Sequence, residues 1–371
     1  MRIFGSNEMA ADVIQRGLCV GCGACVDICP YFRSYRGRTA MLFPCTLPKG
    51  KCHAFCPRAE VDLDELSLQF FGLSYGDNPL GTYISVKAAR GIYPVQNASF
   101  QAGGTVSVLA WLALKNRHIE VAVLTDREGL LPVPRLVTDP DDVFSCASSK
   151  YTAAPTLSAF NKAVREGYKR IGVVATPCQV IGLAQRRLNP MAESDFMDCA
   201  SLVIGLFCTW AVDFRSFEPY ISGRFAVEGI KKMDIPPPPA QVMEVYLEKG
   251  KAELPLNDIR GFIPAGCSYC WDMTAEFSDL SVGALEGRPD MNTLIIRTER
   301  GQQLVWQALK HGYLQVEELP VENLEHLAEA AKNKKKRGLM KLKEDGLFNT
   351  DDPAEHACLR MMPEVAEKII T

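Results

Sequence analysis

Four cysteines near the start of the chain constrain its fold more than any other feature. Cys19, Cys22, Cys25 and Cys29 are followed by Pro30, which gives the pattern CxxCxxCxxxCP. Two-residue spacers bend the backbone tightly enough for three thiolates to hold one iron–sulfur cube, and the fourth cysteine of such a run ligates the other cluster of a two-cluster domain. A zinc site would need two CxxC pairs, or one pair with histidines, at a longer spacing. The pattern therefore predicts a 4Fe-4S site.

A second, incomplete version of this pattern follows. Cys45, Cys52 and Cys56 come next along the chain, and Pro57 again stands directly after the last cysteine. If the exchange of ligands between two clusters holds, it assigns two sets. The first cluster takes Cys19, Cys22, Cys25 and Cys56, and the second takes Cys29, Cys45 and Cys52.

The second set has only three thiolates, because Pro48 and Lys49 stand where a fourth cysteine would be expected. Such a site would hold a 3Fe-4S cluster, use a non-cysteine ligand such as His53, or be partly occupied. In the alternative interpretation, Cys45 and Cys52 are structural thiols and only one N-terminal cluster forms.

Four further cysteines follow a looser pattern. Cys178 and Cys208 each come at the end of an expected strand, and Cys267 and Cys270 form a CxxC. Strand ends place side chains at one edge of a sheet, where a loop that carries CxxC would complete a four-thiolate site. Buried free cysteines are also common in ordinary cores, so the spacing alone leaves both interpretations open. The other cysteines lack such a setting and are interpreted as structural: Cys146, Cys199 and Cys358.

The composition limits the class of protein. The net charge of −3 and the isoelectric point near 6.0 provide no positive field for nucleic acid. No apolar run approaches the roughly 20 residues that cross a bilayer, and the N-terminus lacks the apolar stretch and cleavage site of a secretory signal. We therefore expect a cytoplasmic protein without a membrane span, in which 14 cysteines serve metal or redox chemistry rather than disulfides.

The chain is expected to divide into three parts: a ferredoxin-like iron–sulfur domain over 1–78, a larger domain over 79–345 and a C-terminal tail over 346–371. In the larger domain, strand-like apolar runs alternate with helical stretches, which predicts an α+β fold with an α/β-like core. The expected strands are 121–125, 171–176 and 202–208, and the expected helices are 105–117 and 155–167.

Two segments of the larger domain have an unusual composition. The run from Pro236 to Pro239 can continue neither a helix nor a central strand, so it is interpreted as a loop or extended connector. Residues 322–343 indicate a basic helix, whose cations would form a solvated face or, beside a redox site, attract an anionic cofactor or partner. These cations are Lys332, Lys334, Lys335, Lys336 and Arg337.

Six ordered motifs in the larger domain point to a known family. They are LGTYISVKAAR, QAGGTVSVLAWLAL, SKYTAAPT, VVATPCQVIGL, IGLFCTW, and AGCSYCWDMTAEFSDLSVGALEG with LIIRT after it. From about Leu80 to Lys343 the chain resembles the coenzyme F-420 (F420) hydrogenase/dehydrogenase beta-subunit family. Its members include beta subunits of deazaflavin-reducing hydrogenases and of formate dehydrogenases.

The resemblance implies an α+β domain of the family's own, non-Rossmann type, with a mixed sheet, that binds FAD beside a 4Fe-4S cluster. The ligands that carry over are Cys178, Cys208, Cys267 and Cys270. The N-terminal segment resembles the two-cluster module of longer members, so two or three clusters are expected in all. Family members often have Trp-Ser-Thr after the SVG motif, where this chain has Met291, Asn292 and Thr293. We therefore expect a different pocket for the external electron carrier.

Flavin contacts are expected in two motifs: Gly103, Gly104 and Thr105 in one, and Ser149, Lys150, Tyr151 and Thr152 in the other. Paired glycines at a helix start allow close approach of a pyrophosphate to free N–H groups, although a helix start often contains glycine for other reasons. The lysine would meet a phosphate or a reduced flavin, and its neighbours would add hydrogen bonds. The absence of GxGxxG argues against a Rossmann domain.

These features predict an oxidoreductase subunit that passes electrons between a hydride carrier (F420 or NAD(P)H), or ferredoxin, and a partner through FAD and clusters, with no catalytic acid or base. The partner would be a formate dehydrogenase, hydrogenase or heterodisulfide-reductase-like subunit. One alternative is a self-contained FAD and iron–sulfur reductase of a small organic substrate, which would turn over without a partner. Another is a zinc-stabilised binding protein, which would contain neither iron nor sulfide.

Overall fold

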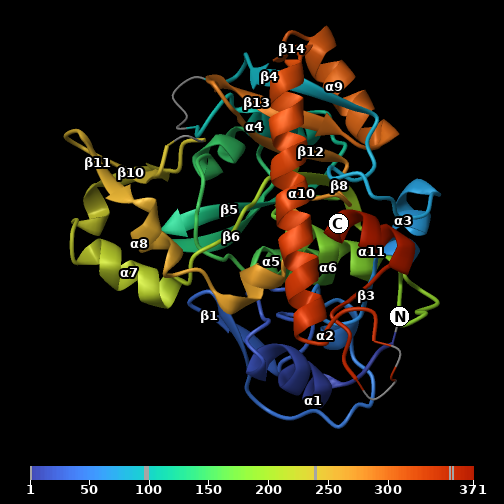
Figure 1. The fold of residues 1–371 in the computed structure, drawn as a ribbon. Helices are drawn as coiled ribbons and strands as arrows, with labels where there is room; N and C mark the ends of the chain where they lie inside the picture. Colours follow the sequence, from blue (N-terminus) through green and yellow to red (C-terminus); the bar gives the residue numbers. More distant parts are fainter. Residues whose placement is uncertain (1, 96–99, 238–239, 351, 353–354) are drawn as a thin grey trace.

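An eight-stranded mixed sheet forms the centre of the computed structural model, which describes residues 2–95, 100–237, 240–350, 352 and 355–371 (Figure 1). From one edge to the other its strands are β14 (Leu314–Glu318), β4 (Ser85–Gly91), β13 (Arg288–Ile296), β12 (Leu280–Leu285), β8 (Ala200–Leu206), β7 (Ile171–Ala175), β5 (Val121–Glu128) and β6 (Leu131–Val137). The inner pairs β5/β7, β7/β8 and β8/β12 are parallel, and the outer pairs are antiparallel. The predicted mixed sheet is therefore confirmed.

Strand β5 shows why this sheet needs helices on both faces. Val121 and Val123 pack into one hydrophobic cluster, whereas Ala122 and Leu124 pack into another. Successive side chains of a strand point to opposite faces, so an uninterrupted apolar run must be covered on both sides. Helices α5 (Thr156–Arg165) and α6 (Pro177–Arg187) contribute to the first cluster, and α4 (Thr105–Lys115) and α9 (Glu299–Lys310) to the second.

The expected elements of the larger domain are all present, with shifted ends. The helices predicted over 105–117 and 155–167 are α4 and α5, which end two residues earlier than expected. The strand predicted over 202–208 is β8, which begins at Ala200 and ends at Leu206. Cys208 therefore lies just beyond the strand, in the loop that follows it.

A small lobe projects beside the large sheet (Figure 1). It consists of the antiparallel strands β9 (Ile230–Asp234), β10 (Val242–Leu247) and β11 (Lys251–Pro255) with helices α7 (Phe214–Ser222) and α8 (Leu256–Arg260), around an apolar core of its own. The proline run lies between β9 and β10. Pro236 and Pro237 are in an irregular connection, as predicted, and Pro238 and Pro239 fall outside the described residues.

The N-terminal segment and the C-terminal tail pack together. The segment contains α1 (Ser6–Glu8), the helical turn η1 (Met9–Gln15), the hairpin β1 (Phe32–Tyr35) and β2 (Arg38–Met41), α2 (Lys51–Ala54), β3 (Val61–Asp62) and α3 (Leu63–Phe71). In the tail, β15 (Leu359–Arg360) pairs in parallel with β3, and α11 (Pro363–Ile370) contacts the long helix α10 (Val321–Glu344). Buried Glu60 forms ion pairs with Arg2 at 2.7 Å and with Arg360 at 3.0 Å.

Helix α10 is the basic helix predicted over 322–343, and it runs along the molecule toward the N-terminal segment (Figure 1). The interpretation of its cations as a solvated face is wrong for two of them. Lys334 and Lys335 are 3% and 2% exposed. The helix packs against the turn that carries Cys267 and Cys270, and Lys335 forms a buried ion pair with Glu276. No helix in the described part of the chain is long and apolar enough to cross a membrane.

Candidate functional site

The first predicted set of cysteines surrounds a small cavity in the N-terminal segment. Cys19, Cys22, Cys25 and Cys56 all line it, together with Met9, Thr39 and Arg58. The grouping is the one that the exchange of ligands predicts. It joins three cysteines of one run to the last cysteine of the other run, far along the chain.

Glycines allow the first run to wrap around this cavity. Gly21 and Gly23 have φ values of 66° and 84°, which side chains with a Cβ rarely adopt. A Cβ on Gly23 would also lie 2.6 Å from the carbonyl oxygen of Pro155. Buried Asn161 on α5 donates to the carbonyls of Ala24 and Val26 at 3.1 and 2.7 Å, which fixes the loop against the larger domain.

The second set is also brought together. The pKa of Cys52 is raised to about 11, chiefly by burial, and Cys29 and Cys45 lie near enough to contribute to this rise. His53 as a fourth ligand stays a prediction. Its fully buried ring packs edge-on against Phe4 at 5.3 Å, and neither ring nitrogen has a hydrogen-bond partner among the described residues. Burial lowers its pKa to about 4, which favours the neutral imidazole that can bind a metal.

The third set converges at the edge of the large sheet. Strands β7 and β8 are parallel neighbours, so Cys178 and Cys208, just beyond their carboxyl ends, lie at the same edge. The turn η4 (Ala265–Tyr269) brings Cys267 and then Cys270 to this edge. Each of the four thiols is close to at least one other member of the set. In each such pair, one thiol raises the pKa of the other.

The surroundings of these thiols suit iron–sulfur clusters. Burial raises the pKa of Cys22 and of Cys56, but backbone N–H groups of Ala24 and Arg58 donate to the two sulfurs and act in the opposite direction. Such hydrogen bonds are one of the means by which proteins stabilise cluster thiolates. Within the described residues, no three Cys, His, Asp or Glu side chains are placed to hold a single metal ion.

The first and third sets are neighbours. After burial, the nearby thiol of Cys178 is the largest influence that raises the pKa of Cys22. Buried Arg58 lies between the two sets, where it donates to the carbonyls of Gly266 at 3.1 Å and Tyr269 at 3.3 Å. The cysteines therefore form a continuous series from the sheet edge into the N-terminal segment.

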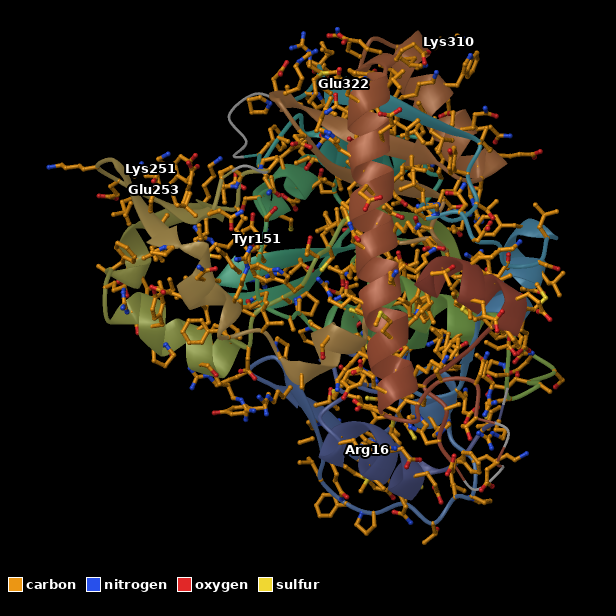
Figure 2. The ribbon with its side chains drawn as sticks, viewed as in Figure 1. Arg16, Tyr151, Lys251, Glu253, Lys310 and Glu322 are labelled. Carbon is orange, nitrogen blue, oxygen red and sulfur yellow. The ribbon has the colours of Figure 1, made fainter. Side chains whose placement is uncertain are left out.

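A second cavity contains the predicted SKYT motif. Ser149, Lys150, Tyr151 and Thr152 line it together with Arg127, Ser148, Lys232 and Met233. Figure 2 shows Tyr151 where the small lobe meets strands β5 and β6. Burial lowers the pKa of Lys150 to about 8, and its ammonium donates to three loop carbonyls, of which the nearest is that of Cys146 at 2.6 Å.

Gln101 connects this cavity to the glycine motif. Its side-chain amide donates to the Tyr151 hydroxyl at 3.0 Å and accepts from the hydroxyl of Ser149. Lys232 donates to the carbonyl of Phe100 at 3.2 Å. The segment that precedes Gly103 therefore forms part of the wall around the SKYT motif.

The glycine motif itself has a packing role. Gly104 has a φ of 72° and caps α4, and a Cβ on Gly103 would lie 2.9 Å from the carbonyl oxygen of Asp290. The N–H and hydroxyl of buried Thr105 are directed to Asn292 at 3.3 Å and to Ala89 at 3.1 Å. Flavin contact by these residues stays a prediction, with less support than contact by the SKYT motif.

Sequence reasoning missed several cations near these sites. Arg58 follows Cys56-Pro57 directly, and this adjacency to a ligand motif was the available signal. No local pattern marks Arg127 or Lys232, which reach their cavity through the fold. Lys334 lies in the basic run that the sequence marked, but the run did not indicate that this cation is buried. Of the cysteines interpreted as structural, buried Cys358 lies close to Arg58 and Cys270, whereas Cys146 and Cys199 are outside the three sets.

Comparison with known proteins first defines the class. Residues 12–31 match the family model described as "4Fe-4S binding domain". Residues 94–161 and 168–322 match the models of the N-terminal and C-terminal parts of the coenzyme F420 hydrogenase/dehydrogenase beta chain. The chain is thus an iron–sulfur protein of the oxidoreductase class.

The relatives then identify the family. The coenzyme F420 hydrogenase subunit beta of Methanothermobacter thermautotrophicus is 31% identical over 281 residues, which cover 72% of this chain and 98% of that protein. The chain therefore belongs to the coenzyme F420 hydrogenase/dehydrogenase beta-subunit family, as its motifs predicted.

Two further comparisons are informative. The coenzyme F420-dependent sulfite reductase of Methanocaldococcus jannaschii is 28% identical over 310 residues, but this match covers only 46% of that enzyme. A solved chain of the F420-reducing [NiFe] hydrogenase complex from Methanosarcina barkeri superposes with a TM-score of 0.67 at 24% identity, over 72% of this chain and 94% of that one. The last comparison shows a shared fold.

Proposed function

We propose that this chain exchanges electrons between a hydride carrier and a partner oxidoreductase subunit through one FAD and three iron–sulfur clusters. The observation that carries the proposal is the continuous series of cysteine sets. Arg58, which lines the cavity of the first set, also donates to the carbonyl of Gly266, directly before Cys267 of the third set. Closely spaced centres are what stepwise electron transfer requires.

The cluster ligands follow the three sets. The core cluster, at the sheet edge, is held by Cys178, Cys208, Cys267 and Cys270, and the first N-terminal cluster by Cys19, Cys22, Cys25 and Cys56. The second N-terminal cluster has only Cys29, Cys45 and Cys52, so a 3Fe-4S cluster is the form that fits three thiolates. Residues 1–78 and the tail from 346 form one module around the N-terminal clusters, and residues 79–345 form the flavin domain.

FAD is proposed to bind at the SKYT cavity, in a domain of non-Rossmann type. When bound, a flavin supplies the conversion between two-electron and one-electron chemistry. The protein's part is to hold the phosphates with the cations Arg127 and Lys232 and the hydroxyls of Ser149 and Thr152, all of which line the cavity. Tyr151 is held in place by a hydrogen bond to buried Asp234 at 3.1 Å, which shapes the wall.

The relatives favour F420 over the other carriers. Two of them are named for F420 hydrogenase and F420-dependent sulfite reductase, and a third belongs to the F(420)H(2) dehydrogenase of Methanosarcina mazei and is 28% identical over 79% of this chain. NAD(P)H and ferredoxin remain the competing carriers. A hydrogenase, formate dehydrogenase or heterodisulfide-reductase-like protein would be the partner, in the cytoplasm.

The test is an anaerobic titration of the purified chain. We expect iron, labile sulfide and a yellow chromophore, with flavin absorbance bleached by reduced F420 and not by NADH, NADPH or reduced ferredoxin. An Arg127→Met variant should lose flavin but keep its iron, whereas a Lys251→Met variant, changed on the exposed strand β11, should keep both. A colourless protein, or one that contains zinc in place of iron and sulfide, would refute the proposal.

A second candidate is a self-contained reductase, and the similarity to the sulfite reductase favours it. Because more than half of that enzyme has no counterpart in this chain, the similarity extends to only part of it. Turnover of sulfite or another small acceptor by the isolated chain with reduced F420 would establish the second candidate. Dye reduction alone, until a partner oxidoreductase is added, would support the first.

A further inference from the structure

Two cations are buried beside the proposed core cluster without a carboxylate partner. Lys334 and Arg58 are each 3% exposed, and neither forms an ion pair with a carboxylate within the described residues. Lys334 donates to the carbonyl oxygen of Cys208 at 2.5 Å. Arg58 donates to the carbonyls of Gly266 and Tyr269, which stand directly before Cys267 and Cys270.

The next residue of the same helix shows what a buried lysine ordinarily needs. Lys335 forms an ion pair with Glu276 at 2.8 Å, and both side chains are 2% exposed. Asp272 is near enough to influence Lys334 electrostatically but forms no ion pair with it. Its carboxylate oxygens instead accept hydrogen bonds from the backbone N–H groups of Thr274, Ala275 and Glu276. Burial of a charge without a countercharge is very unfavourable, so Lys334 and Arg58 require negative charge from another source.

The thiols of the core set are in position to supply that charge. Lys334 donates to the carbonyl oxygen of Cys208, and its helix packs against the turn that brings Cys267 and Cys270 to the sheet edge. Arg58 donates to two carbonyls of that same turn.

Resting on the function proposed above, we propose that Lys334 and Arg58 are the counter-cations of the core cluster and raise its reduction potential. A cube held by four thiolates is negatively charged, and one-electron reduction adds a further negative charge. A fixed cation nearby therefore stabilises the reduced form more than the oxidised form. The two cations make the core cluster a better acceptor of electrons from a reduced flavin.

The two cations lie near different sets of cysteines. Arg58 also lines the cavity of the first N-terminal set, whereas Lys334 donates to Cys208 of the core set. Removal of Arg58 should therefore shift the potentials of two clusters. Removal of Lys334 should shift that of the core cluster alone.

The test is a potentiometric titration of the full chain, followed by electron paramagnetic resonance, for the wild type and four variants. Lys334→Met should lower the equilibrium constant for reduction of the core cluster about tenfold or more, which is about 59 mV per tenfold for a one-electron couple. Lys334→Arg should retain the wild-type potential, and Arg58→Met should lower the potentials of both the core and the first cluster. The control is Lys332→Met, an exposed lysine two residues earlier on the helix, which should change nothing.

The outcomes separate this inference from the function on which it rests. If the wild type contains no iron–sulfur signal, the proposed function fails. If its signals are present and Lys334→Met leaves the core potential unchanged, or if Lys334→Arg shifts it as far as Lys334→Met does, the electrostatic role alone is refuted. Loss of the core cluster from both Lys334 variants would mean that this residue maintains shape rather than charge, and would also overturn the inference.

Discussion

The ion pair between Glu276 and Lys335 should be the costliest single contact of helix α10 to break. The two charged groups are 2.8 Å apart and almost completely buried, and at an effective dielectric constant of about 20 their attraction is roughly 6 kcal/mol. The hydroxyl of Tyr75 donates to Glu276 at 2.8 Å, and Lys335 donates to the carbonyl of Asn78 at 3.1 Å. The network thus links α10 to the segment just before the large sheet.

Glu276→Gln leaves the Lys335 ammonium buried and unpaired, so we expect the free energy of unfolding to fall by about 3–5 kcal/mol. Lys335→Met should lower the free energy of unfolding by a similar amount. It leaves the carboxyl group of Glu276, whose pKa burial already raises, without its countercharge. The double variant, which buries no charge in this pair, should be less destabilised than the sum of the single variants by about 2–3 kcal/mol.

The assay is guanidinium unfolding of anaerobically prepared protein, followed by far-ultraviolet circular dichroism. The control is Glu166→Gln, which breaks the exposed pair with Lys162 on α5 and should cost less than about 0.5 kcal/mol. Additive losses in the double variant, or single losses below about 1 kcal/mol, would show that the pair is not the buried contact described and would refute the reasoning.

Three further outcomes are expected. Cys208→Ser should lower the iron content by about four atoms per chain, because one cubane cluster is lost. Cys199→Ser changes a cysteine outside the three sets and should leave the iron content unchanged. Equal iron in both variants would contradict the assignment of the core cluster. Burial lowers the pKa of Lys150 to about 8, so its positive charge is lost as pH rises through that value. The affinity for FAD should therefore fall between pH 7 and 9 in the wild type and stay constant in Lys150→Met. Parallel pH curves for the two proteins would argue against a charge effect. Burial raises the pKa of Glu60, but the ion pairs with Arg360 and Arg2 bring it below the ordinary value. The ionised carboxylate of Glu60 therefore stabilises the fold above about pH 4.3, and this stabilisation is lost as pH falls through the folded-state pKa. Glu60→Gln should therefore speed hydrogen exchange in residues 355–371 at pH 7 and make less difference in acid; a pH-independent difference would exclude the carboxylate as the cause.

The family and the cysteine chemistry could be predicted from the sequence because they depend on short spacings. The CxxC spacers place thiolates together through a few backbone bonds, and Gly21 and Gly23 provide the conformations that those bends need. The alternation of apolar runs and amphipathic stretches likewise predicted the strands and helices, since burial on a sheet face imposes that period locally. Their ends were less certain, as the position of Cys208 beyond β8 shows.

Which distant residues become neighbours was decided by the tertiary structure alone. The parallel pairing of β7 and β8 places Cys178 beside Cys208, and the packing of α10 buries Lys334 against the same edge. A run of lysines has the same local pattern whether it faces solvent or a cluster, so the sequence predicted the helix but not which of its charges are buried. Burial and electrostatic contact depend on surfaces that meet only when the whole chain has folded.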